Sequence, residues 1–339
     1  MKFIVFVKSI LVAAVLGLLT AGAAHAAASA IVDTAYVQAA IKRGAILWDT
    51  RSADDFKKGH IPGAVNIGDI GKTLRDDNTE DYIAQTQIEK LLNDAGIDLS
   101  KEVVVYGAKG NPFVYFGRLT VVHFGGRNAY VYHGGIDDWK TAGQAVSTDG
   151  TRLAPVQQSL KVDPTVAVST DDVLKSLNKT SVQIVDARTP REYSGEDIRA
   201  IRGGHIPGAI NIPYEQNWVD PDAPGKLAKK EVTNKDGLAL KSMEQLKALY
   251  VNLDPGKETI VYCQSGVRAA ETATVLQSLG FKNVKVYDSS WLGYGNTLSA
   301  PASRETFFNV GALNGRIAAL QNHIEALEKQ LAAVKAARQ

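Results

Sequence analysis

Apolar and polar positions follow two alternating patterns along this chain. Short runs rich in β-branched residues predict strands at 46–48, 103–106, 184–185 and 259–262. Helix-like stretches separate these runs; one of them opens at Ser169 with a capping pattern and another closes at Gly280. Strands that alternate with helices are typical of an α/β fold, in which helices flank a central parallel sheet.

The same series of segments occurs twice. Each copy has an apolar run that ends in Asp-x-Arg, and a nine-residue segment follows that differs between the copies by a single Val/Ile exchange. In chain order, the matching pairs are 49–51 and 186–188, 59–67 and 204–212, 103–107 and 259–263, and 130–132 and 285–287. Preserved order over such a length indicates a duplicated domain. We therefore expect two tandem domains with central parallel sheets, at 27–150 and 165–302, joined by a polar linker.

Two segments lie outside the repeat. The second copy carries an insertion, roughly 215–237, rich in Pro, Asp and Lys, which is either a lid over a site or a surface excursion. The tail, 305–339, has apolar residues at alternating intervals of four and three: Leu313, Ile317, Leu320, Ile324, Leu327, Leu331 and Val334. This heptad spacing predicts a helix that forms a coiled coil, and hence a homo-oligomer. The alternative is a helix that packs on its own domain.

The first 26 residues predict a secretory signal peptide. Lys2 and Lys8 are basic, 10–19 is almost wholly apolar, and Ala24 and Ala26 give the small-x-small form that signal peptidase cuts after. The apolar run is short for a membrane span, so an uncleaved anchor is the weaker alternative. We expect an exported protein, located in the periplasm of a bacterium.

Composition directs attention to one thiol. The chain has 38 basic and 36 acidic residues, and the two leader lysines account for the excess, so nothing favours binding to nucleic acid. An exported chain usually pairs its cysteines, yet this one has a single cysteine, Cys263. Such a thiol is either an inert core residue or a reactive group.

The neighbours of Cys263 favour a reactive thiol. It ends an apolar strand, and residues 264–268 lead into a helix. In an open α/β sheet, ligands bind beyond the carboxyl ends of the strands. Backbone N–H groups of the turn, the helix N-terminus and Arg268 can together stabilise a thiolate. Gly266 permits a backbone conformation that a Cβ would hinder.

Three motifs resemble the successive signatures of the rhodanese family: Asp186-x-Arg188, the Gly-His-Ile-Pro-Gly-Ala segment at 204–209, and Cys263-x-x-Gly266-x-Arg268. Asp288-Ser289-Ser290-Trp291 resembles the Asp-Gly-Ser-Trp segment of two-domain thiosulfate and mercaptopyruvate sulfurtransferases. The resemblance extends over about 32–301 and implies two tandem rhodanese-like domains. It implies an inactive first domain, where Gly107 stands at the cysteine position, and a catalytic second one.

The resemblance also implies roles for single residues. Cys263 would take a sulfane sulfur from a small anionic donor, hold it as a persulfide and pass it to a thiophilic acceptor. The backbone of Gln264, Ser265, Gly266 and Val267 would cradle the charge. Arg268 would bind the donor or steady the loop, and Asp186 and Arg188 would brace it. His60 and His205 lie in turns that the family uses structurally, and we expect neither a metal nor a cofactor.

Two departures from the family leave the donor open between thiosulfate, which we favour, and 3-mercaptopyruvate. Glu192 precedes Tyr193, where two-domain members typically have an arginine, and the loop ends in Arg268 rather than threonine. A non-catalytic sulfur-binding or scaffold protein remains an alternative function. A cysteine-dependent phosphatase or arsenate reductase is another, but those enzymes carry one more residue between the cysteine and the arginine.

Overall fold

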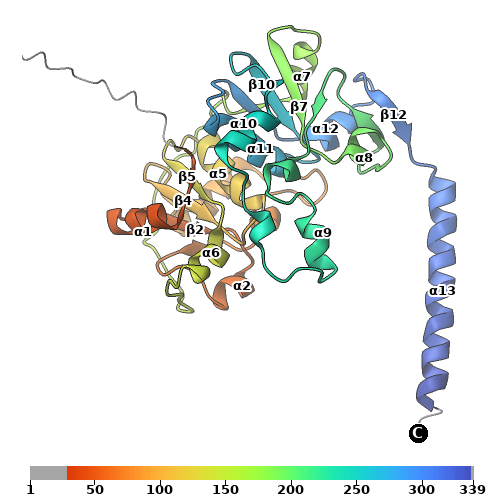
Figure 1. The fold of residues 1–339 in the computed structure, drawn as a ribbon, viewed down its shortest axis with the longest axis horizontal. Coiled ribbons are helices and arrows are strands. Elements are labelled where there is room, and N and C mark those ends of the chain that lie inside the picture. Colours follow the sequence, from red (N-terminus) through yellow and green to blue (C-terminus); the bar gives the residue numbers. More distant parts are fainter. Residues whose placement is uncertain (1–28, 337–339) are drawn as a thin grey trace, which may run out of the picture.

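The computed structural model describes residues 29–336, so the predicted signal peptide lies outside the described residues. Two α/β domains lie side by side, and a long helix extends away from the second (Figure 1). Within residues 29–336, no helix is long and apolar enough to cross a membrane. The expected fold class, two tandem domains with parallel sheets and a C-terminal helix, is confirmed.

The first domain is built on a five-stranded parallel sheet with the strand order β1-β5-β4-β2-β3. Its strands are β1 (Ile31–Val32), β2 (Ile46–Asp49), β3 (Val65–Asn66), β4 (Val103–Tyr106) and β5 (Ala129–Tyr132). Its helices are α1 (Thr34–Arg43), α2 (Ala53–Lys57), α3 (Ile70–Thr73), α4 (Gln85–Asp94), α5 (Phe113–His123) and α6 (Gly135–Thr141).

The second domain repeats this plan with the order β6-β11-β10-β7-β9. Its sheet strands are β6 (Ala167–Val168), β7 (Val182–Asp186), β9 (Ile210–Asn211), β10 (Glu258–Tyr262) and β11 (Val284–Tyr287). Its helices are α7 (Thr170–Ser176), α8 (Pro190–Tyr193), α9 (Ala223–Ala228), α10 (Met243–Leu249), α11 (Val267–Ser278) and α12 (Ser290–Asn296), with short 3₁₀ turns η1 (Tyr214–Asn217) and η2 (Asp236–Leu238). Corresponding strands take the same places in both sheets, which agrees with a duplicated domain.

Strand β10 brings the loop that starts at Cys263 to the edge where ligands bind. It lies between β7 and β11, and its residues 259–262 are fully buried, which is why this strand reads as a continuous apolar run. Tyr262 pairs in register with Asp186 at the end of β7. The residues that follow the two strands therefore emerge together at the carboxyl edge of the sheet.

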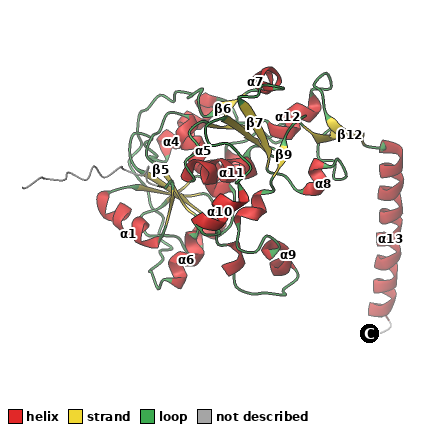
Figure 2. Cartoon of the chain, turned by 45° about the horizontal axis from the view of Figure 1, so that its top comes forward, coloured by secondary structure: helices red, strands yellow, loops and turns green. Residues whose placement is uncertain are grey.

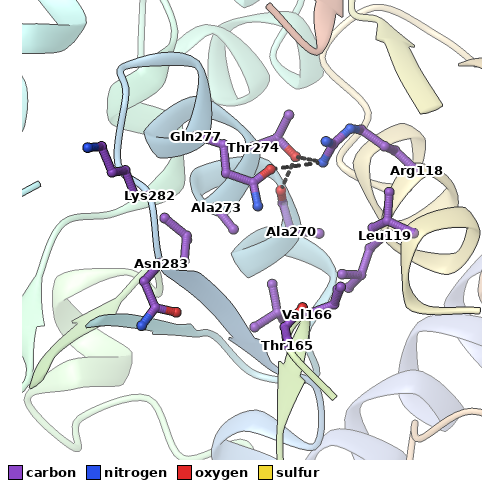
Figure 3. Close-up of a pocket in the computed structure, with 13 residues that line it drawn as sticks. Arg118, Leu119, Thr165, Val166, Ala270, Ala273, Thr274, Gln277, Lys282 and Asn283 are labelled. Carbon is purple, nitrogen blue, oxygen red and sulfur yellow. Dashed lines mark hydrogen bonds between the residues drawn. The ribbon is translucent and has the colours of Figure 1, made fainter. Parts of the chain in front are cut away.

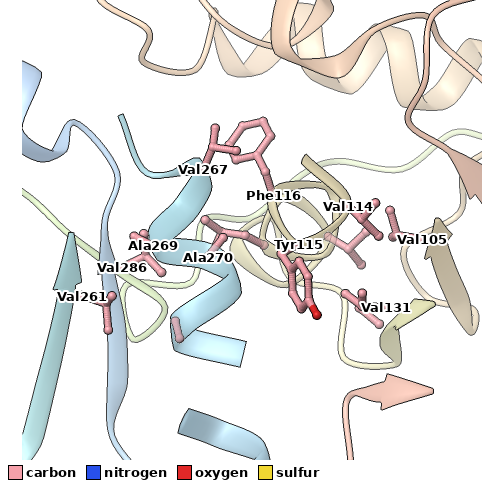
Figure 4. Packing of buried hydrophobic residues seen from close by; sticks show 14 of the residues in the cluster. Val105, Val114, Tyr115, Phe116, Val131, Val261, Val267, Ala269, Ala270 and Val286 are labelled. Carbon is pink, nitrogen blue, oxygen red and sulfur yellow. The ribbon is translucent and has the colours of Figure 1, made fainter. Parts of the chain in front are cut away.

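The two domains share one hydrophobic core. Helix α5 of the first domain packs against α11 of the second (Figure 2). The side chains of Phe116 and Val267 lie next to each other in this core (Figure 4). Because α11 begins directly after the Cys263 loop, the interface also fixes the loop relative to the first domain.

The insertion at 215–237 bridges the domains, so neither interpretation offered by the sequence describes it fully. Lys235 Nζ lies 2.9 Å from the carboxylate of Asp137 in the first domain. Immediately after it, the carbonyl of Leu238 lies 2.7 Å from His133 Nε2. At its start, Trp218 donates to Glu271 of α11 over 2.9 Å.

The C-terminal helix α13 (Val310–Ala336) has no buried residue and extends away from both domains (Figure 1). Its seven heptad residues are all exposed, so the alternative of a helix packed on its own domain is wrong. Strand β12 (Ser303–Phe307) precedes it and pairs with β8 (Arg202–His205). The boundary expected between 302 and 305 thus falls within a strand that belongs to the second domain.

Candidate active site

A four-residue loop, 263–266, connects β10 to α11. Gly266 has a φ of +81°, in the left-handed region that favours glycine. A Cβ on Gly266 would collide with the Asp288 carboxylate and lie 2.9 Å from the Asp288 carbonyl oxygen. The residue at this position is therefore fixed both by its backbone angle and by the segment packed against it.

Ser290, at the start of α12, holds the loop from the side. Its Oγ accepts the N–H groups of Cys263 and Gly266, each over 3.0 Å, and donates to the carbonyl of Tyr287 over 2.6 Å. The Trp291 N–H donates to the carbonyl of Cys263 over 3.0 Å. Ser290 had no predicted role, and its only signal in the sequence was the Asp-Ser-Ser-Trp motif.

The loop still offers free backbone donors. Within the described residues, no protein acceptor takes the N–H groups of Gln264, Ser265, Val267 and Arg268. The Gly266 N–H, by contrast, is occupied by Ser290. Of the expected cradle at 264–267, the amides of Gln264, Ser265 and Val267 thus remain available, and the amide of Arg268 adds a fourth donor.

The charge of Arg268 is matched by a buried carboxylate. Both terminal nitrogens of Arg268 donate to Glu192, each over 2.8 Å, and Glu192 is 1% exposed. Burial alone would raise the pKa of Glu192, but the hydrogen bonds from Arg268 and its positive charge lower it to about 2. Glu192, which departs from the family pattern, therefore forms a buried ion pair with Arg268, the arginine that follows the loop.

Asp186 and Arg188 form a buried pair behind the loop. The guanidinium of Arg188 binds the Asp186 carboxylate, with its shortest contact at 2.6 Å, and donates to the Gly204 carbonyl over 2.8 Å. Tyr262 also donates to Asp186 over 2.6 Å. Asp186, Arg188 and Tyr262 do not line the pocket that contains Cys263. This position behind the loop is the one expected for residues that support it.

Neither of the two turn histidines lines this pocket either. The His205 ring stacks on Tyr193 with 3.6 Å between centroids, and its Nδ1 lies 2.8 Å from the Tyr193 carbonyl. His60 stacks on Phe56 in the same way, with 3.7 Å between centroids. Among residues 29–336, no group of three or more His, Cys, Asp or Glu side chains could hold a metal ion.

Cys263 lines a pocket of about 360 Å³ between the two domains. The first domain contributes Glu80, Pro112 and Phe113, while the second contributes Arg199, Tyr214 and Glu215 besides residues of the loop. The loop residues were predicted from the sequence, but none of these six was. The pocket walls come from segments far apart in the chain, which no local motif brings together.

The first domain also reaches under the loop. Arg75, 4% exposed, donates to the carbonyl of Ser265 over 2.6 Å and lies 3.3 Å from Asp288. Burial raises the pKa of Asp288 to about 6, although the positive charge of Arg75 opposes this. Arg75 thus makes an interdomain contact with the Cys263 loop that could not be predicted from any motif.

The equivalent loop of the first domain has no room for a thiol. A Cβ on Gly107 would lie 2.8 Å from Thr50 Oγ1 and 3.0 Å from Val114. A Cβ on Gly110 would lie 2.9 Å from Leu238, which the second domain places over this loop. The first-domain loop therefore leaves little space for a side chain at positions 107 and 110, and it has no cysteine.

A second interdomain pocket, of about 230 Å³, lies between α5 and the C-terminal part of α11 (Figure 3). Arg118 crosses it and donates to Gln277 over 3.1 Å and to Thr274 over 3.4 Å. Cys263 is not among its lining residues, so we place the chemistry at the other pocket.

The site combines a lone thiol with a strand-to-helix loop and backbone amides that no acceptor in residues 29–336 takes. The model of the rhodanese-like domain matches this chain twice, at 33–142 and 169–297, and the chain belongs to that family. It is 36% identical, over 72% of its length and 79% of the relative's, to a thiosulfate sulfurtransferase of Corynebacterium glutamicum.

Two further matches extend the comparison. A sulfur carrier protein of Thermus thermophilus is 31% identical, over 74% of this chain and 87% of the relative. Among solved structures, an anaerobic ergothioneine biosynthesis enzyme from Chlorobium limicola superposes with a TM-score of 0.69. That match covers 81% of this chain and 70% of the enzyme at 22% identity, and it shows a common fold.

Proposed function

We propose that this protein is a sulfurtransferase that moves a sulfane sulfur from thiosulfate to a thiophilic acceptor through a persulfide on Cys263. The observation that carries the proposal is the placement of this thiol in the interdomain pocket, next to four N–H groups, two in its loop and two in the first turn of α11, that no acceptor within residues 29–336 takes. The family and the relatives named as thiosulfate sulfurtransferases support it.

The geometry suits a thiolate that alternates with a persulfide. The free amides and the N-terminus of α11 stabilise negative charge on either sulfur. Arg268 and Arg199 line the pocket, and both contact the single buried carboxylate of Glu192. The two guanidinium groups offer charged hydrogen-bond donors, which suit a small anionic donor.

Intact mass spectrometry tests this function directly. After incubation with thiosulfate, the wild type should carry one added sulfur, located on Cys263, and an acceptor thiol should remove it. The Cys263→Ser variant should gain none. If the wild type gained no sulfur from any donor and instead hydrolysed p-nitrophenyl phosphate, the phosphatase alternative would replace this proposal.

We also propose that the exposed stripe of α13 pairs with that of a second copy. In heptad terms, Val310, Ile317, Ile324 and Leu331 occupy the a positions, and Leu313, Leu320, Leu327 and Val334 the d positions. β-branched residues at a with leucine at d favour a parallel two-stranded coiled coil. Eight exposed large apolar residues on one helix are also difficult to reconcile with an isolated chain.

We further propose that the chain is exported to the bacterial periplasm, supported by the basic, apolar and small-x-small order of residues 1–26. Mass analysis of the protein from its producing cell should find a mature N-terminus near Ala27. A retained Met1 in a cytoplasmic fraction would contradict export.

A further inference from the structure

Glu215 lies in the reaction pocket without a partner for one of its oxygens. It belongs to η1, at the start of the bridging insertion, and lines the same pocket as Cys263 and Arg268. Its Oε2 is buried, and within residues 29–336 no donor contacts it. Burying an ionised carboxylate oxygen without a donor costs far more free energy than burying a protonated carboxyl group.

The charges around Glu215 leave it without a cation of its own. Arg268 favours the ionised form of Glu215, but this guanidinium already makes two hydrogen bonds to Glu192, which repels a second negative charge. Glu271, on the adjacent helix α11, is buried and interacts with Glu215 as another acid. Burial is the largest effect and raises the pKa of Glu215 above its ordinary value.

We propose that Glu215 is the proton carrier of the sulfur transfer, giving a proton to the departing sulfite and taking one from the incoming thiol. This inference rests on the proposed persulfide function. A carboxyl group that lines the same pocket as the nucleophile can act as an acid in one half-reaction, when it is protonated, and as a base in the other, when it is ionised.

In the donor half-reaction, the Cys263 thiolate attacks the outer sulfur of thiosulfate. A new S–S bond forms to Cys263, and the S–S bond to the sulfonate group breaks. The electron pair leaves on sulfite, which takes the proton of Glu215 and departs as hydrogensulfite. Cys263 is then a persulfide anion and Glu215 a carboxylate.

In the acceptor half-reaction, a thiol gives its proton to the Glu215 carboxylate, and the resulting thiolate attacks the terminal sulfur of the persulfide. The S–S bond to Cys263 breaks and returns its electron pair to the Cys263 thiolate. The acceptor leaves as a persulfide. Both starting protonation states are restored, and no outside oxidant or reductant is needed.

The test compares Glu215→Gln with Glu231→Gln in single-turnover measurements of both half-reactions, with thiosulfate as donor and dithiothreitol as acceptor. Each change removes one carboxylate from the bridging insertion, but Glu231 is exposed and does not line the pocket, so it serves as the matched control. We expect Glu215→Gln to slow both half-reactions by about 100-fold, which lies within the range of general acid–base catalysis. Glu231→Gln should stay within about twofold of the wild type, and Glu215→Asp should recover part of the rate.

The pH profiles separate proton transfer from a structural effect. The wild-type donor step should slow as pH rises through the pKa of Glu215, and the acceptor step should slow as pH falls through it. The Glu215→Gln variant should show neither of these pH dependences. It should also unfold at the same temperature as the wild type. Unchanged rates and pH profiles in this variant, or an equal loss of rate in Glu231→Gln, would overturn the role of Glu215. A wild type that never gains a sulfur would instead overturn the proposed function.

Discussion

The guanidinium of Arg75 donates a 2.6 Å hydrogen bond to the carbonyl of Ser265, 190 residues further along the chain. Arg75 belongs to the domain that has no cysteine, and Ser265 to the loop that carries Cys263. The same guanidinium lies 3.3 Å from Asp288, whose backbone also packs against Gly266. The first domain therefore helps to determine the conformation of a loop that it does not contain.

Replacing Arg75 with methionine should lower both stability and activity. The change leaves Asp288 and the Ser265 carbonyl without their buried donor, which should reduce the free energy of unfolding by about 3 kcal/mol. Thermal unfolding and the rate of persulfide formation give the two readings. The control is Arg43→Met, since Arg43 is half-exposed in its ion pair with Glu102 and should cost at most about 1 kcal/mol. Equal losses in both variants would contradict a special role for Arg75.

A cysteine introduced at position 107 should not create a second active site. In a Cys263→Ser background, Gly107→Cys should accept no sulfur from thiosulfate, because its Cβ would lie 2.8 Å from Thr50 Oγ1. It should also destabilise the chain by about 1–3 kcal/mol through overpacking. Mass spectrometry and thermal unfolding check the two statements. Sulfur on the introduced thiol would mean that the first loop has kept its function.

The Arg268–Glu192 pair should make stability depend on pH in the acid range. The folded-state pKa of Glu192, about 2, lies below its ordinary value of 4.5. The pair therefore contributes stability that is fully present above pH 4.5 and is lost as pH falls through about 2. We expect Glu192→Gln to unfold more easily at pH 7 by about 3 kcal/mol, with a difference that shrinks towards about pH 2.

Denaturant unfolding measured from about pH 7 to about pH 2 checks this prediction. Glu196→Gln is the matched control, because Glu196 is exposed and lies 3.7 Å from Arg191. That variant should follow the wild-type curve closely. A constant difference between Glu192→Gln and the wild type at all pH values would show that the charge of Glu192 contributes little.

Truncation after Asn309 should lower the oligomeric mass and leave sulfur transfer unchanged. This cut removes α13 but keeps β12, whose Glu305 binds the buried guanidinium of Arg202. Light scattering should show a dimer for the full mature chain and a monomer for the truncated one. A matched variant, Leu320→Lys with Leu327→Lys, should also be monomeric, because it places charges on the seam. A monomeric full chain would rule out the coiled coil.

The sequence predicts those parts of the fold and site that depend on short stretches of chain. The buried strand before Cys263, the glycine at 266 and the duplication could all be recognised, because hydrophobic period and turn chemistry are local properties. Arg75 and Glu215 could not be predicted, because their positions depend on tertiary packing. Arg75 reaches the Ser265 carbonyl through the packing of the first domain on the second, and Glu215 reaches the pocket through the bridging insertion. Glu192 was noticed as a departure, but its pairing with Arg268 required the tertiary arrangement.

Glu80 and Phe113 of the first domain form a pocket wall beside Cys263. The residues that control what approaches the sulfur can therefore differ from those that activate it, whereas a single-domain enzyme performs both tasks with the residues of one domain. Substitutions in this wall alter what can approach the sulfur without touching the loop that activates it. After duplication, the copy without a thiol is therefore free to vary on its pocket-facing surface, while its buried contacts to the loop remain constrained. Substitutions in the first domain, which has no cysteine, can therefore change which acceptor is preferred.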